Sequence, residues 1–117
     1  MNARMLLLIV LASSIWAPIS RGQVSFERIL SANKEPENWL TYSGTTLSQR
    51  HSLLNQVTPA NVKNLELQWI YQARSLEKFE ATALVVDGVM YTVQAPNDVV
   101  ALDAATGRIF WTYSHHP

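Results

Sequence analysis

Few side chains in this 117-residue sequence are of types that do chemistry, and they are scattered along it. Cysteine is absent, which excludes a disulfide framework, a thiolate zinc site and a thiol nucleophile. His115 and His116 are adjacent, and neighbouring residues of an extended chain point to opposite faces, so they are not expected to share a metal ion. Glu80 could accept a hydrogen bond from the ring N–H of a cofactor, but on residue type alone it is interpreted as a solvated charge.

The other conspicuous acidic residues are interpreted as structural. Asp87 and Asp98 lie among turn residues, and Glu35 and Glu37 flank Pro36 in what we expect to be a solvated loop. Lys and Arg number 9 and Asp and Glu number 9, and this balance argues against a nucleic-acid-binding face. A hydrophobic content of 48% excludes a disordered chain, and the length allows one small domain at most.

Residues 1–22 have the pattern of a secretory signal peptide. Arg4 supplies a positive start, residues 5–12 are an unbroken apolar run, and Ser20 and Gly22 place small residues before a cleavage site. The run is shorter than the about 20 residues that span a bilayer, so a permanent anchor or a buried helix is the less favoured alternative. We therefore expect cleavage near Gly22, a periplasmic or secreted product and no membrane span after cleavage.

Residues 23–64 are expected to form a short helical and loop segment, called here the lead-in segment. Ser25 can cap a short helix through its hydroxyl. Thr58 followed by Pro59 predicts a second short helix that runs to Asn64. Helices this short are not stable alone, so their apolar residues must pack against something else.

From residue 65 the apolar residues recur with a period of two, which predicts β-strands. The first expected strand is residues 65–73. Asp87-Gly88 predicts a two-residue hairpin turn, because both central positions of a type I′ turn need positive φ. Four strands are expected around this and two further turns, at residues 81–86, 89–93, 99–103 and 108–113. This is an antiparallel meander with open edges, which needs neighbours as a propeller blade does.

The most specific feature is the spacing Ala-x-Asp-x-x-Thr-Gly-x-x-x-Trp, formed by Ala101, Asp103, Thr106, Gly107 and Trp111. Asp103 can accept hydrogen bonds from the backbone of the turn that follows it. Gly107 can adopt the φ of a tight turn, and Trp111 is large enough to fill a gap between adjacent sheets. The alternative is an ordinary hairpin with a buried tryptophan.

This spacing resembles the tryptophan-docking motif of quinoprotein propellers, with Arg108 where lysine is usual. Asn38-Trp39 and the stretch Phe79-Glu80-Ala81-Thr82 are similar to secreted alcohol dehydrogenases dependent on pyrroloquinoline quinone (PQQ), and the likeness covers about residues 24–113. The resemblance implies an all-β fold, an eight-bladed β-propeller. Residues 65–117 would give a preceding strand and one four-stranded antiparallel blade, after the lead-in segment.

The resemblance also implies a function and a role for Glu80. Family members oxidise primary alcohols in the periplasm with PQQ and calcium and pass electrons to a cytochrome, and Glu80 is expected to hydrogen-bond PQQ near the propeller axis. No residue here is expected to be catalytic or to bind a metal, and the tryptophans are expected to pack within the protein. The catalytic aspartate and calcium ligands of the family lie outside this chain, so PQQ and calcium are not expected to bind it alone.

Two function classes remain open at this point. The first is the N-terminal part of a PQQ-dependent alcohol dehydrogenase, as a fragment or a truncated gene product, with the remaining propeller blades as partners. The second is a noncatalytic exported propeller scaffold, and a small β-domain that dimerises through its sheet edges is a third possibility. Glu80 and the lead-in segment favour the first.

Overall fold

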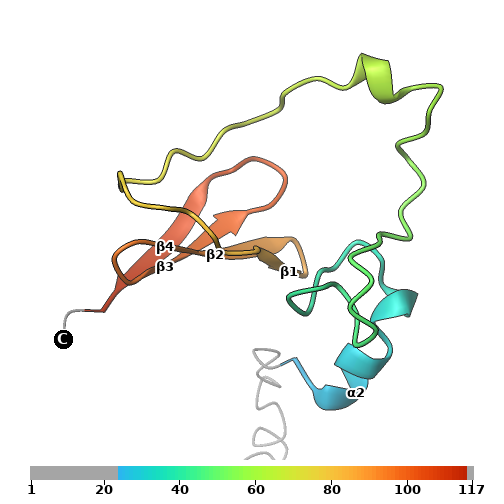
Figure 1. The fold of residues 1–117 in the computed structure, drawn as a ribbon, viewed down its shortest axis with the longest axis horizontal. Helices are drawn as coiled ribbons and strands as arrows, with labels where there is room; N and C mark the ends of the chain where they lie inside the picture. The colour runs from blue at the N-terminus through green and yellow to red at the C-terminus, as the bar shows by residue number, and fades with distance from the viewer. Residues whose placement is uncertain (1–23, 116–117) are drawn as a thin grey trace, which may run out of the picture.

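The structure is a computed structural model that describes residues 24–115. The predicted signal peptide and His116 lie outside the described residues. The chain begins in the lead-in segment beside the sheet, arches away from it and then returns to form the sheet (Figure 1). The elements in chain order are α2 (Phe26–Leu30), η1 (Ala32–Lys34), η2 (Val62–Asn64), β1 (Leu84–Val86), β2 (Val89–Gln94), β3 (Asp98–Asp103) and β4 (Ile109–Ser114).

The first helix begins at the predicted cap and ends earlier than its predicted end near Asn33. The Ser25 hydroxyl accepts a hydrogen bond from the Arg28 backbone N–H at 3.2 Å, which caps α2. The helix ends at Leu30, and the single 3₁₀ turn η1 follows. No helix among residues 24–115 is long and apolar enough to cross a membrane.

The helix predicted after Thr58 is wrong in its cap and its extent. The Thr58 carbonyl, rather than its hydroxyl, accepts from the Val62 N–H at 2.9 Å, and only the 3₁₀ turn η2 forms. The Asn61 side chain competes for the backbone, because its Oδ1 accepts from the Thr58 N–H at 2.7 Å. Its Nδ2 also donates to the Gln56 carbonyl at 2.8 Å. Asparagine side chains that bond to nearby backbone favour a turn over a helix.

The four strands form one antiparallel sheet in the order β1-β2-β3-β4, as predicted. Asp87 and Gly88 have φ of 51° and 80° and join β1 to β2, which confirms the hairpin turn. The first strand is shorter than predicted, since residues 81–83 form no strand and β1 begins at Leu84. Asp98, interpreted as a turn residue, is the first residue of β3.

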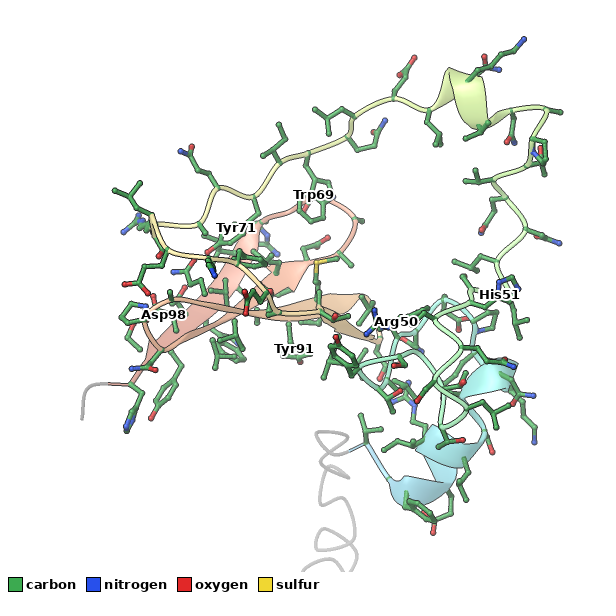
Figure 2. All side chains as sticks on the ribbon, in the orientation of Figure 1. Arg50, His51, Trp69, Tyr71, Tyr91 and Asp98 are labelled. Carbon is green, nitrogen blue, oxygen red and sulfur yellow. The ribbon has the colours of Figure 1, made fainter. Side chains whose placement is uncertain are left out.

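The strand predicted over residues 65–73 does not form. The alternation holds only in the second half, where Trp69, Tyr71 and Ala73 are half-buried, because Leu65 and Leu67 are 64% and 76% exposed. However, the segment lies over a face of the sheet rather than along an edge (Figure 2). Its backbone therefore has no neighbouring strand to pair with in the described part of the chain.

The core lies on the face of the sheet that this segment covers. Val100 and Leu102 are 0% and 1% exposed there. Figure 2 shows Trp69 and Tyr71 on one side of the sheet and Tyr91 on the other. The side that carries Tyr91 is more open, as Val93 of the same strand is 50% exposed.

Candidate functional site

The turn between β3 and β4 is fixed by the Asp103 carboxylate and by backbone hydrogen bonds. Asp103 Oδ1 accepts from the backbone N–H groups of Ala105 at 2.9 Å and Thr106 at 3.0 Å. The Gly107 N–H donates to the Asp103 carbonyl at 2.8 Å, and the Asp103 N–H donates to the Arg108 carbonyl at the same distance. The hydrogen bond from the Thr106 N–H, with a smaller effect from the Ala105 N–H, holds the pKa of Asp103 below its ordinary value of 3.8, although burial acts in the opposite direction.

Lowering the pH is expected to weaken this turn. Because the pKa of Asp103 is lowered on folding, its ionised form stabilises the fold above the ordinary value of 3.8, and this contribution is lost as pH falls through the folded pKa. Asp103→Asn keeps the acceptor oxygen but cannot ionise. We therefore expect its melting temperature, followed by circular dichroism, to fall less than that of the wild type between pH 5 and pH 2.5. Parallel pH profiles for the two chains would contradict this expectation.

Gly107 meets two requirements, of which the sequence indicated one. Its φ is 72°, in the left-handed region that the turn needs. The Trp69 ring also lies directly against its backbone, where a Cβ on Gly107 would be 2.5 Å from Trp69 Cε3. This contact was not predicted, because no local signal in either segment points to the other.

Trp111 lies on the opposite, more open face of the sheet. It is 47% exposed, and its ring centroid is 6.0 Å from that of Tyr91. Ala101 pairs with Tyr91 in β2 and with Trp111 in β4, and it is 0% exposed between them. The small alanine leaves room for both rings to approach across it. Docking of Trp111 onto an adjacent sheet stays a prediction.

Glu80 is exposed and precedes β1 by four residues. Its neighbours Phe79 and Ala81 line an apolar cavity of about 390 Å³ together with Trp69 and Leu102. Glu80 does not line that cavity among the described residues, as expected for alternate positions of an extended chain.

A complete cofactor or metal site is not formed by the described residues. Residues 24–115 contain no group of three or more His, Asp or Glu side chains that could hold a metal ion. Glu80 offers one exposed carboxylate, and the nearby cavity is lined mainly by apolar side chains, so the residues present do not fit PQQ or calcium as a whole site. At most, Glu80 could supply one contact to a polar cofactor edge.

Tyr71 fastens the overlying segment to the sheet. Its hydroxyl donates to Gln94 Oε1 at 2.6 Å, and Gln94 Nε2 donates to Asp98 Oδ2 at 2.8 Å. Gln94 is 5% exposed, so this chain of hydrogen bonds is largely shielded from solvent. Tyr71 and Trp69 therefore hold the segment at two places on the same face.

Glu35, interpreted from the sequence as solvated loop, is instead part of a charged network. Arg28 Nε and Nη2 donate to Glu35 at 2.9 and 2.7 Å, and Arg28 Nη1 and Nη2 donate to Asp87 at 3.0 and 2.6 Å. Asn38 Nδ2 donates to Glu35 Oε2 at 2.6 Å, and Asn38 Oδ1 accepts from the Asp87 N–H at 2.8 Å. We call these four residues the Arg28 clasp.

The Arg28 clasp favours the charged forms of Arg28 and Glu35. Hydrogen bonds from Arg28 lower the pKa of Glu35, and those to Glu35 and Asp87 raise the pKa of Arg28. Arg28 uses both edges of its guanidinium, which is the geometry that favours bidentate carboxylate pairing. The clasp was not predicted from the sequence, because its members come from α2, the following loop and the β1–β2 turn.

The chain is similar to quinoprotein dehydrogenases of known sequence and structure. The family described as "PQQ: Glucose/ethanol/alcohol dehydrogenase, beta-propeller domain" matches residues 39–117. The dehydrogenase subunit of the quinone alcohol dehydrogenase of Acetobacter aceti is 45% identical over 87 residues, which are 74% of this chain and 12% of that protein. The quinohemoprotein alcohol dehydrogenase ADH-IIG of Pseudomonas putida is 45% identical over 86 residues, with the same coverage.

Solved structures give the same result. The structure of ADH-IIG from Pseudomonas putida HK5 has a TM-score of 0.75 and covers 78% of this chain and 13% of that chain. A europium-containing methanol dehydrogenase has a TM-score of 0.70 at 32% identity, covering 77% of this chain and 16% of that chain. The sequence thus spans about 12% of the length of the first curated relatives it matches. The chain belongs to the family of PQQ-dependent glucose, ethanol and alcohol dehydrogenases, and its four strands form one blade of their β-propeller.

Proposed function

We propose that this chain supplies the N-terminal segment and first blade of a periplasmic PQQ-dependent alcohol dehydrogenase, which oxidises a primary alcohol and passes electrons to a cytochrome. The proposal rests on the presence of a blade with the Asp103 turn in a chain that is 45% identical to ADH-IIG over 78% of its length. A 1-butanol dehydrogenase (cytochrome c) of Thauera butanivorans is 49% identical over 64% of the chain. That relative supports both the substrate class and the electron acceptor.

Two unpartnered surfaces support further propeller blades as partners. The open face of the sheet carries exposed apolar side chains, among them Val93 at 50%, Trp111 at 47% and Tyr113 at 58%. Residues 69–73 alternate in burial, yet residues 65–73 belong to no strand. Exposed apolar faces and unpaired extended backbone are costly in isolation, so neighbouring sheets would stabilise both.

Glu80 is the residue that we propose contacts the cofactor. PQQ would accept the electrons of the alcohol, and a bound calcium ion would act as a Lewis acid beside it. The described residues do not form a site for either group, so no catalytic step is assigned to this chain. The proposed role of Glu80 is to accept a hydrogen bond from the quinone and to orient it, and this needs the blades that enclose the cofactor.

Glu80→Gln is expected to weaken PQQ binding in an assembled propeller. The corresponding segment of Pseudomonas putida ADH-IIG would be replaced by residues 24–115 of this chain, and PQQ would be titrated while alcohol-dependent dye reduction is measured. Loss of one charge-assisted hydrogen bond predicts an about tenfold or greater rise in the PQQ concentration needed for half activity. Glu77→Gln, a nearby exposed carboxylate, is the matched control and should leave the titration unchanged. Equal titrations for both variants would remove Glu80 from the proposal.

The assignment to a longer enzyme has its own test. Sequencing the genomic DNA beyond the Pro117 codon should show an in-frame continuation with further Ala-x-Asp-x-x-Thr-Gly-x-x-x-Trp repeats. A stop codon with no such coding sequence nearby would overturn the enzyme function. Export predicts a periplasmic product whose N-terminus is Gln23, which mass spectrometry of that fraction would show.

A further inference from the structure

The lead-in segment covers the outer edge of β1 at one short place. β1 is the end strand of the sheet, so one of its edges has no partner strand. The Trp39 N–H donates to the Val85 carbonyl at 2.8 Å, and the Val85 N–H donates to the Trp39 carbonyl at 3.1 Å. The Asn38 side chain binds the Asp87 N–H next to this bridge. Asn38 and Trp39 thus occupy the edge that would otherwise be open.

Apolar packing between the lead-in segment and the blade is incomplete beside this bridge. A cavity of about 390 Å³ is lined from one side by Pro36 and Trp39 and from the other by Ala83 and Met90. Ser52 and Leu54 line the same cavity, whereas residues 55–68 are exposed throughout. Residues 55–68 can therefore accommodate movement of residues 24–50 without loss of a buried side chain.

We propose that residues 24–50, called here the strap, cover the β1 edge and that the Arg28 clasp holds the strap in this position. With the clasp closed, one fork of Arg28 binds Glu35 within residues 24–50, and the other fork binds Asp87 and so ties α2 to the β1–β2 turn. With the clasp open, the strap leaves as a unit and uncovers Leu84–Val86, while β2, β3 and β4 remain paired. The inference concerns how the fold opens and does not depend on the proposed cofactor contact.

The hydrogen bonds indicate that the Arg28 clasp, more than the bridge between Trp39 and Val85, holds the strap on the β1 edge. The bridge supplies two neutral backbone hydrogen bonds, whereas the clasp supplies charge-assisted ones, which are roughly twice as strong each. The Arg28 and Glu35 side chains are 27% and 20% exposed, whereas Asp87 is 63% exposed, so solvent screens the Arg28–Asp87 pair more than the Arg28–Glu35 pair. Asn38 is 8% exposed and would lose its bond to the Asp87 N–H if the clasp opened, while its bond to Glu35 would stay within the strap. Opening therefore breaks the bonds of Arg28 and Asn38 to Asp87 together.

Amide hydrogen exchange of the full chain tests whether the Arg28 clasp holds the strap on the β1 edge. In Arg28→Met we expect the N–H groups of Trp39, Val85 and Asp87 to exchange about tenfold or more faster than in the wild type. The N–H of Leu102 in β3 should be unchanged. Arg74→Met, at an exposed arginine in the irregular segment, is the matched control and should change none of these rates.

Arg28→Lys keeps the proposal falsifiable if Arg28→Met fails to fold. Lysine retains the charge but cannot form two carboxylate forks, so faster exchange at Val85 and Asp87 with Leu102 unchanged is again expected. Unchanged exchange at Val85 in Arg28→Lys would overturn the proposal that the Arg28 clasp holds the strap. Equal acceleration at Val85 and Leu102 would also overturn it, since the clasp would then hold the whole fold. The proposal would also be overturned if the Val85 N–H of the wild-type chain exchanged as fast as that of the exposed Leu67.

Discussion

Gly107→Ala is expected to destabilise the chain much more than Gly88→Ala, although both glycines have positive φ. Gly107 and Gly88 have φ of 72° and 80°, so an added Cβ costs about 1–2 kcal/mol of backbone strain at either position. At Gly88 the Cβ meets nothing within 4 Å, whereas at Gly107 it lies 2.5 Å from Trp69 Cε3. Displacing a packed ring adds about 1–3 kcal/mol of overpacking at Gly107 alone.

Urea unfolding of the two variants and the wild type measures this difference directly, provided that the dependence on urea concentration keeps the same slope. Trp69→Ala in the Gly107→Ala background separates strain from packing, because only the overpacking disappears when the ring is removed. The double variant should lose much less stability than the sum of the two single changes. Equal losses in Gly107→Ala and Gly88→Ala would mean that Trp69 does not lie on Gly107 in solution.

The parts of the fold that follow from local chemistry could be predicted from the sequence. The Asp87-Gly88 turn depends on the φ that each residue tolerates, and the cap at Ser25 depends on a hydroxyl within reach of one N–H. The hydrogen bonds of Asp103 likewise reach only two and three residues along the chain. These requirements are met within a single turn, so residue types at fixed spacing are enough to indicate them.

The parts that depend on distant contacts could not be predicted in this way. The alternation predicted a buried side over residues 65–73, which is correct for Trp69, Tyr71 and Ala73 and wrong for Leu65 and Leu67. Burial against a face and pairing along an edge leave the same pattern. Glu35 was interpreted as solvated because no local pattern links it to Arg28. Arg28 also binds Asp87, which is 59 residues away in the sequence. Glu80 also lacks a local signal, and its proposed role comes from the family.

Leu102→Ala is expected to have a comparably large effect on stability, because Leu102 is the point where the overlying segment and the sheet meet. Its side chain is 1% exposed near the end of β3 and lines the cavity of about 390 Å³ with Trp69, Tyr71 and Phe79. Truncation removes apolar contacts and enlarges a space that the surrounding residues already fail to fill. Buried leucine-to-alanine changes of this kind cost about 2–5 kcal/mol.

For a chain of this size, such a loss lowers the melting temperature by about 10 °C or more. Leu67→Ala is the matched control, since Leu67 is 76% exposed and the same truncation there should change stability by less than about 0.5 kcal/mol. Thermal unfolding followed by tryptophan fluorescence suits the comparison, because Trp69 lies beside the new cavity. If both variants melted together, residues 65–83 would not cover this face in solution, and the burial of Leu102 would have to come from neighbouring blades. The outcome therefore decides whether this chain carries its own core or completes it only within the propeller.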